Sequence, residues 1–190
     1  MSRASVDAGL EAVARTAQAS KALSGKVEVI AARYAQVLRA GGTLYFCGNG
    51  GSAADAQHVA AEYVVRYTGS RRALAAVALT TDTSILTAAG NDLGFEQVFA
   101  RQVEALCRPE DLLVLHSTSG ESGNLIAAAR VARKAGVPIV AFLGKGGGQL
   151  AGLVDEAVVI PSDHTSLIQL MHLALQHLIV ESVEAELLGG

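Results

Sequence analysis

Apolar residues recur at three- and four-residue spacings over residues 7–40, the spacing of an amphipathic helix. The pair Gly41-Gly42 follows the last apolar position and is a typical helix-ending signal. The pattern therefore predicts two helices, or one helix broken near Ser24-Gly25.

From Thr43 onward the pattern changes to short apolar runs bounded by Gly, Ser, Thr and Asp, as in buried parallel strands. The runs cover residues 43–47, 74–79, 112–116, 139–143 and 158–160. Helical patterns lie near residues 52–66, 83–88, 95–106, 122–135, 148–152 and 165–188. Strand and helix alternate, which predicts an α/β fold: a doubly wound parallel sheet with an N-terminal helical extension over residues 1–40. We expect one domain over residues 1–190.

Composition narrows the class of protein. Hydrophobic residues make up 51% of the chain and charged residues 17%, yet no apolar run approaches the length of a membrane span. The apolar excess predicts buried subunit interfaces. The first eight residues lack a signal-peptide pattern, so we expect a cytoplasmic protein.

Charge and cysteine content exclude further classes. The net charge of −3 and the absence of a long basic stripe argue against nucleic acid as the main ligand. Cys47 and Cys107 are too far apart for a CxxC metal pair and end apolar runs, so we expect reduced core residues.

The loop after the first predicted strand reads Gly48-Asn49-Gly50-Gly51-Ser52. Its glycines allow a ligand to approach the backbone, and the following helix offers free N–H groups, so the loop has the form of an anion site. It also fits a dinucleotide fingerprint, which needs an acidic residue at the end of the second strand; that region reads Thr80-Thr81-Asp82, so a nicotinamide enzyme is a weaker alternative. A tight turn without a ligand is the third interpretation.

The loop after the third predicted strand is rich in hydroxyl groups. Its hydroxyl side chains are Ser117, Thr118, Ser119 and Ser122, at the mouth of a helix. One serine would suffice for an N-cap, and hydroxyls together with helix N–H groups form a good cradle for a phosphate monoester. The chain has no GxxxxGK[ST] motif, so a phosphorylated small molecule is favoured over a nucleoside triphosphate.

Polar residues on two helices are candidates for chemistry. His58 and Glu62 are spaced i, i+4 and share one helix face, with Asp55 a turn earlier, which suits a metal pair, an acid/base pair or a surface ion pair. The apolar last helix carries four further polar residues, namely Gln169, His172, Gln176 and His177. Helical geometry alone does not select His177 among them, since a lone histidine on such a face is often a hydrogen-bonded core residue.

Together these residues resemble the sugar isomerase domains, and among them the phosphoheptose isomerases. The stretch from Gly48 to Glu62 resembles the first signature of that family, and it is the most specific match. The likeness continues through residues 81–84, 90–99 and 117–120, and through Ile168-Gln169, His172 and His177. It spans nearly the whole chain in order.

The resemblance implies a five-stranded flavodoxin-like domain in a homotetramer that isomerises sedoheptulose 7-phosphate to glycero-manno-heptose 7-phosphate. By motif match, the phosphate would be held by Ser117, Thr118, Ser119 and Ser122. The sugar site would include Asn49, Gly50, Gly51, Ser52, Glu62, Asn91, Asp92 and Gln169. A metal, zinc where reported, would be held by His58, Glu62, Gln169 and His177, with His177 entering a site assembled from more than one subunit. Glu62 and His177 would be the catalytic base and acid.

Three residues depart from the family pattern. Glu121 stands beside the phosphate loop where the family has Asn or Asp, and Leu167 and Leu170 replace the Arg and Glu that flank Ile168-Gln169. These departures put the exact sugar in doubt more than the substrate class.

Two other functions compete with the isomerase. One is a non-catalytic regulator that binds a replication initiator protein; such relatives lack the glutamate and the final histidine, whereas Glu62 and His177 are both present here. The other is a sugar-phosphate sensor, which usually carries a DNA-binding domain, and residues 1–40 lack the character of a basic recognition unit.

Overall fold

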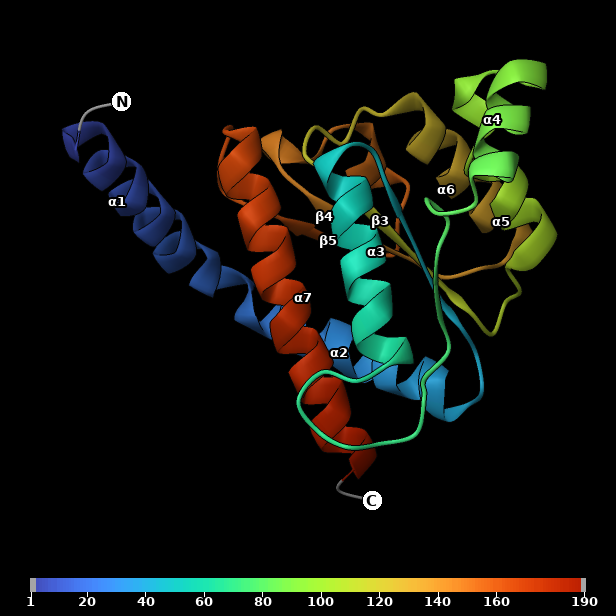
Figure 1. Ribbon diagram of the computed structural model, residues 1–190, viewed down its shortest axis with the longest axis horizontal. Coiled ribbons are helices and arrows are strands. Elements are labelled where there is room, and N and C mark those ends of the chain that lie inside the picture. The colour runs from blue at the N-terminus through green and yellow to red at the C-terminus, as the bar shows by residue number, and fades with distance from the viewer. Residues whose placement is uncertain (1–2, 189–190) are drawn as a thin grey trace.

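The computed structural model describes residues 3–188, so the outer ends of the predicted 1–190 domain lie outside the described residues. Figure 1 shows a twisted sheet covered by helices on both faces, with one long helix leading away from the body. The strands are β1 (Leu44–Gly48), β2 (Ala76–Ala78), β3 (Leu112–Ser117), β4 (Ile139–Leu143) and β5 (Glu156–Val159). The α-helices are α1 (Arg3–Ser20), α2 (Ser24–Arg39), α3 (Gly51–Val64), α4 (Thr83–Asp92), α5 (Ala100–Leu106), α6 (Gly123–Ala135) and α7 (Thr165–Leu188). Short 3₁₀ turns are η1 (Lys21–Leu23), η2 (Phe95–Gln97), η3 (Lys145–Gly147) and η4 (Gln149–Gly152).

All five strands are parallel, in the order β2-β1-β3-β4-β5. The order reverses direction between β1 and β3, where the connections leave on opposite sides of the sheet. Ligands of such sheets bind at this switch point, at the carboxyl ends of the strands. The glycine loop after β1 and the hydroxyl loop after β3 both lie there, and the predicted doubly wound five-stranded fold is confirmed.

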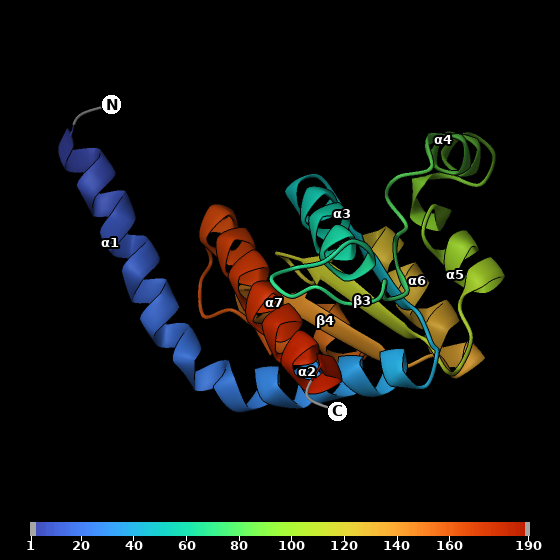
Figure 2. The same cartoon turned by 60° about the horizontal axis from the view of Figure 1, so that its bottom comes forward.

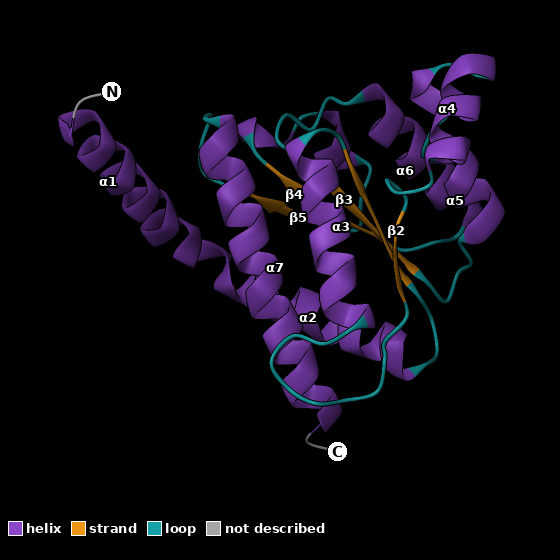
Figure 3. Ribbon diagram, viewed as in Figure 1, coloured by secondary structure: helices purple, strands orange, loops and turns teal. Residues whose placement is uncertain are grey.

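Two apolar cores flank the sheet because the side chains of a strand alternate between its faces. Leu44, Phe46 and Val114 face a core shared with α2, α3 and α7. Tyr45 and Leu115 face the opposite core, which α5 and α6 cover. Figure 3 shows the strands between these helical layers. Cys47 and Cys107 are free and buried in the second core, as expected.

The element boundaries differ from the prediction where tertiary contacts override local pattern. β2 is shorter than the apolar run 74–79, because the Leu74 N–H donates to the carbonyl of Tyr63 at the end of α3. β5 begins earlier than predicted, at half-buried Glu156, which pairs with Val140. The helix expected over 95–106 is split into η2 and α5.

The last helix packs against the body of the fold along one side. Among residues 3–188, α7 is the one helix long and apolar enough to cross a membrane, and 44% of its most apolar window is buried inside the protein. It packs against α2 and α3 and buries His172, Gln176 and Glu184. Polar groups on that buried side need partners within the protein.

By contrast, α1 leads away from the body, as Figures 1 and 2 both show. Its Val6 and Leu10 are 46% and 64% exposed. The break between the two N-terminal helices falls at η1, immediately before Ser24-Gly25, and confirms the predicted interruption.

Candidate active site

Three predicted residues converge between α3 and α7. The imidazole Nε2 atoms of His58 and His177 are 3.0 Å apart, and His58 Nε2 is 3.3 Å from Glu62 Oε1. Candidate ligand atoms of all three residues lie within 4.8 Å of one another. A surface ion pair would explain why His58 and Glu62, one turn apart on α3, lie close together. It does not explain why His177 of α7 lies beside them.

The spacing and chemistry of this trio fit a divalent metal. Two atoms that each lie about 2.0–2.1 Å from zinc at the tetrahedral angle are about 3.3 Å apart. Two imidazoles and one carboxylate form a known ligand set of catalytic zinc, which keeps the fourth position open. The His58 side chain is 47% exposed and that of Glu62 is 20% exposed, so the trio is accessible from solvent in one protomer.

The structure corrects the expectation that His177 enters the site through the assembly of more than one subunit. His177 meets His58 within a single chain, so no second subunit is required to bring it to the site. The helices α3 and α7 run side by side (Figure 1), and this packing places His177 where helical geometry alone could not.

Gln169, the fourth predicted ligand, lies elsewhere in the same protomer. It is about two turns before His177, which is about 12 Å along the helix axis. Its side-chain amide faces Gly51 so closely that a Cβ on Gly51 would lie 2.6 Å from Gln169 Nε2. The first turn of α7 therefore packs against the first turn of α3.

Local geometry explains the glycines of the loop after β1. Gly50 has a φ of 56°, which side chains rarely adopt, and a Cβ on Gly48 would lie 2.6 Å from the carbonyl oxygen of Ser52. Ser52 itself is 3% exposed, so its side chain lies beneath the loop. Asn49 forms two reciprocal amide hydrogen bonds with Asn124 of α6.

A hollow of about 160 Å³ opens beside this loop. Its lining residues are Gly48, Asn49, Gly50, Ala53, Thr80, Leu86, Phe95, Val98 and Phe99. Two of the predicted sugar-binding residues, Asn49 and Gly50, therefore line this hollow at the end of β1.

The hydroxyl loop after β3 is organised by its own side chains. Ser117 Oγ accepts from the Gly120 N–H at 3.0 Å, and Ser119 Oγ accepts from the Glu121 N–H at 3.1 Å. Ser117 and Ser122 hydroxyls are 3.3 Å apart. Thr118 is half-buried in the same loop. Ser122 is the N-cap position of α6, and its side chain makes no hydrogen bond to the N–H groups of the helix, so these groups are left for the phosphate that the sequence predicts.

Glu121, beside that cradle, binds Gln149, a contact that its sequence position did not reveal. Its carboxylate accepts from the backbone N–H of Gln149 at 2.9 Å and from Gln149 Nε2 at 2.7 Å. The Glu121 carboxylate therefore ties the hydroxyl loop to the first residue of η4. Asn91 and Asp92 are exposed at the end of α4, where Asn91 Nδ2 donates to Asp92 Oδ1 at 2.7 Å.

The other two polar residues of α7 serve the core. Gln176 Nε2 lies 3.0 Å from His116 Nε2 and 3.4 Å from the Tyr34 hydroxyl, and His172 Nε2 is 3.1 Å from the Leu143 carbonyl. Burial lowers the pKa of His116 to about 3 and that of His172 to about 4. Both imidazoles are therefore neutral at pH 7.

Asp55 is not part of the trio, although it precedes His58 by one turn. Burial raises the pKa of its carboxyl, while nearby His58 lowers it. Its buried Oδ2 has no hydrogen-bond partner among residues 3–188.

Sequence reasoning missed a buried ion pair beyond the trio. Arg71 Nε and Glu184 Oε1 are 2.7 Å apart, and the two side chains are 3% and 4% exposed. Glu184 follows His177 by seven residues, so the two share a helix face. That spacing is the signal by which Glu184 could have been found.

Comparison with known proteins agrees with this architecture. Residues 10–144 match the family model of the SIS domain. A phosphoheptose isomerase of Akkermansia muciniphila is 50% identical over 178 residues, covering 94% of this chain and 94% of that protein.

Two solved structures share the fold throughout. The phosphoheptose isomerase of Neisseria gonorrhoeae superposes with a TM-score of 0.92 at 40% identity, over 96% of this chain and 98% of that one. A phosphoheptose isomerase of Francisella tularensis gives 0.90 at 32% identity, with coverage of 96% and 98%. The chain therefore belongs to the phosphoheptose isomerases, within the SIS-domain family.

Proposed function

We propose that this enzyme converts sedoheptulose 7-phosphate to D-glycero-D-manno-heptose 7-phosphate, the first step in making nucleotide-activated heptose. The observation that carries the proposal is the convergence of His58, Glu62 and His177 in a chain half identical to a phosphoheptose isomerase. An aldose–ketose isomerase needs such proton-transferring groups, whereas a regulator without catalysis does not.

The phosphate end of the substrate is assigned to the hydroxyl loop. Ser117, Thr118, Ser119 and Ser122 surround the N-terminus of α6, whose positive dipole end favours an anion. Sugar hydroxyls are assigned to the glycine loop, from Asn49 to Ser52, and to Asn91 and Asp92.

The trio is assigned to one divalent metal ion, with zinc as the proposed occupant. Such an ion supplies Lewis-acid polarisation of the substrate carbonyl when bound. Since Gln169 stands about 12 Å along α7 from His177, we assign it to the substrate and, as the fourth ligand, to the site of a neighbouring subunit. We place the enzyme in the cytoplasm as a homotetramer.

The reaction moves one proton from C1 to C2 and another between the two oxygens, so it needs a base near the carbons and an acid near the carbonyl. Glu62 Oε1 is assigned to take and return the carbon-bound proton through an enediol. His177 is assigned to donate a proton to the oxygen. Glu62 and His177 both lie beside His58, and the candidate ligand atoms of the three residues lie within 4.8 Å of one another, so base and acid can reach the same substrate.

Purified protein incubated with sedoheptulose 7-phosphate, and followed by NMR, tests this proposal. Aldose signals should form without added nucleotide. Absence of turnover with this sugar and with its five- and six-carbon analogues, after zinc is restored, would refute it. Binding of a replication initiator protein in place of turnover would instead support the regulator.

A further inference from the structure

The buried carboxylate of Glu184 binds the loop that follows α3. It accepts from the consecutive N–H groups of Tyr67, Thr68 and Gly69 at 2.9–3.0 Å and from the Thr68 hydroxyl at 3.1 Å. Arg71 Nε donates at 2.7 Å to Oε1, the oxygen that also accepts from the Tyr67 N–H. Burial alone raises the pKa of Glu184, but these donors outweigh it and hold the pKa at about 2, so the carboxylate is charged at pH 7.

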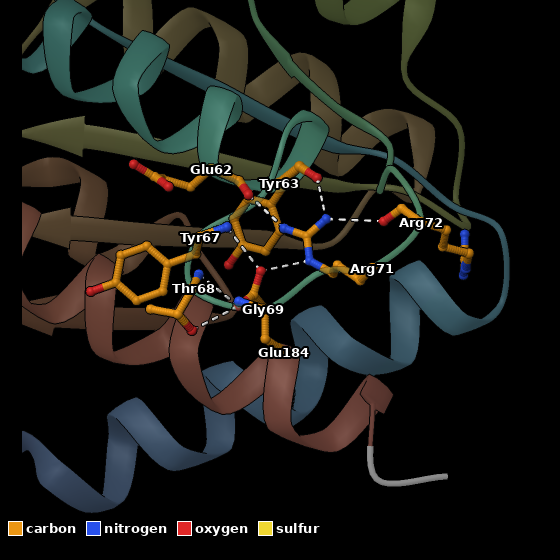
Figure 4. Close-up of polar contacts among 8 residues, drawn as sticks. All are labelled: Glu62, Tyr63, Tyr67, Thr68, Gly69, Arg71, Arg72 and Glu184. Carbon is orange, nitrogen blue, oxygen red and sulfur yellow. Dashed lines mark hydrogen bonds and ion pairs between the residues drawn. The ribbon is translucent and has the colours of Figure 1, made fainter.

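Arg71 binds α3 with the rest of its guanidinium. Nη2 donates to the Glu62 carbonyl at 2.5 Å, and Nη1 donates to the Tyr63 carbonyl at 2.8 Å. These carbonyls belong to the last turn of α3, where helix oxygens lack intrahelical partners. Figure 4 shows the guanidinium between these carbonyls and Glu184. The pair thereby ties the turn that carries Glu62 to α7.

The same loop reaches the third member of the trio. The ring of Tyr67 stacks on that of His177, with centroids 5.5 Å apart and an interplanar angle of 18°. His177 in turn meets His58 edge to face at 5.2 Å. Tyr67 is half-buried, and its backbone N–H is one of the donors that Glu184 holds.

We propose that Glu184 and Arg71 are positioning residues for the trio, with Tyr67 as the group that transmits their effect to His177. Arg71 holds the last turn of α3, with Glu62, at a fixed place along α7. Glu184 holds the 67–69 backbone so that the Tyr67 ring limits the rotation of the His177 imidazole. This inference rests on the proposed function only in the statement that the trio binds a metal.

The expected effect follows from ligand orientation. Partners that orient metal ligands typically change metal affinity by about 10–100-fold when they are removed. The hydroxyl loop lies on other elements, so the pair should leave phosphate binding unchanged. Loss of the pair should therefore lower metal affinity and kcat while the KM for the sugar phosphate stays within about twofold.

The test compares Glu184→Gln and Arg71→Lys with a matched control, Glu186→Gln. Glu186 lies two positions after Glu184 in α7. It pairs with Arg39 at 2.9 Å, but this ion pair is exposed. A lysine at position 71 keeps the charge but lacks the planar fork that serves Glu184 and two carbonyls together. Co²⁺ affinity and the visible spectrum of bound Co²⁺ should change in both test variants and not in the control.

A second measurement needs neither metal nor substrate. In the metal-free protein, the NMR signals of the His177 ring protons are identified by their absence from the spectrum of His177→Gln. Their chemical shifts include a contribution from the ring current of Tyr67. Glu184→Gln, Arg71→Lys and Tyr67→Leu should move these resonances, whereas Tyr67→Phe and Glu186→Gln should not. Tyr67→Leu should also lose Co²⁺ affinity by about tenfold or more, and Tyr67→Phe should retain it.

The outcomes separate the two proposals. A wild-type protein without turnover or metal binding refutes the proposed function, while the His177 resonances still decide the positioning role. Arg71→Lys with wild-type resonances and Co²⁺ affinity overturns the positioning role, even if Glu184→Gln does not fold. Equal behaviour of Tyr67→Leu and Tyr67→Phe overturns the part assigned to the ring.

Discussion

The side-chain amides of Asn49 and Asn124 donate to each other, at 2.9 and 2.8 Å, and join the glycine loop to the first turn of α6. Asn124 is 4% exposed, so removal of its partner leaves an unpaired amide in the interior. We predict that Asn49→Ala lowers the free energy of unfolding by about 1–3 kcal/mol.

Urea denaturation of both single variants and the double variant measures this coupling. The double variant should lose clearly less than the sum of the singles, since the second substitution removes a group that is already unpaired. Simple additivity would show that the amides do not interact in solution.

The hydroxyl loop supplies the second prediction. Ser119→Ala and Ser122→Ala should weaken the binding of sedoheptulose 7-phosphate, since each hydrogen bond to a charged group contributes about 1.5–3 kcal/mol. Binding of unphosphorylated sedoheptulose, measured by calorimetry, should barely change. Equal losses for the two sugars would mean that the loop does not hold the phosphate.

The third prediction concerns assembly. Leu10 of α1 is 64% exposed and Leu178 of α7 is 52% exposed, and α1 stands away from the body of the protomer (Figure 2). We predict a homotetramer in which these apolar faces are covered. Light scattering should report four chains for the wild type and fewer for Leu10→Asp and Leu178→Asp. Leu106→Asp on α5, where the leucine is 43% exposed, is the control and should remain a tetramer.

The fold was predictable because its signals are local. The apolar runs and the glycine signals between them need no knowledge of distant residues, and all five strands were located. The ends of β2 and β5 were not, since contacts such as that of the Leu74 N–H with Tyr63 depend on tertiary packing.

The candidate site was predictable only in part. The i, i+4 spacing brought His58 and Glu62 together, but the choice of His177 over His172 depends on how α7 rotates against α3. The role of Glu121 also depends on a residue far along the chain, because Gln149 binds its carboxylate. The pair of Glu184 and Arg71 spans 113 positions, and no local pattern joins them.

Acid stability provides the fourth prediction. Burial holds the folded-state pKa of His116 at about 3 and that of His172 at about 4, both below the ordinary value of 6.5. The unfolded chain therefore binds protons that the folded chain excludes, and stability falls as the pH drops below 6.5. Between pH 7 and pH 5, each histidine should reduce the free energy of unfolding by about 2 kcal/mol.

Urea denaturation at several pH values checks this dependence. His172→Gln should flatten the fall in stability between pH 7 and pH 5. The exposed His164 is the matched control, and His164→Gln should keep the wild-type slope. Equal slopes for all three proteins would contradict the buried neutral state of His172.

The last prediction concerns Glu62, whose two proposed roles compete, because a carboxylate bound tightly to a metal is a poor base. We predict that substrate releases Glu62 from the metal site and frees it to take the proton. Glu62→Gln should then keep the fold, phosphate binding and most of the metal, yet lose at least about 10²-fold in kcat. His177→Ala should lose both metal and rate. Glu104→Gln, an exposed change on α5, is the control.

Isotope exchange separates the proposed base from other routes. In heavy water, the wild type should carry solvent deuterium into C2 of the aldose, at least in part, because a carboxylate exchanges its proton while the enediol is bound. NMR of the product measures this incorporation. Full retention of the C1 hydrogen over many turnovers, together with a near-normal rate for Glu62→Gln, would rule out the enediol route. A hydride shift between the two carbons would then explain the reaction, since it moves hydrogen without exposing it to a base.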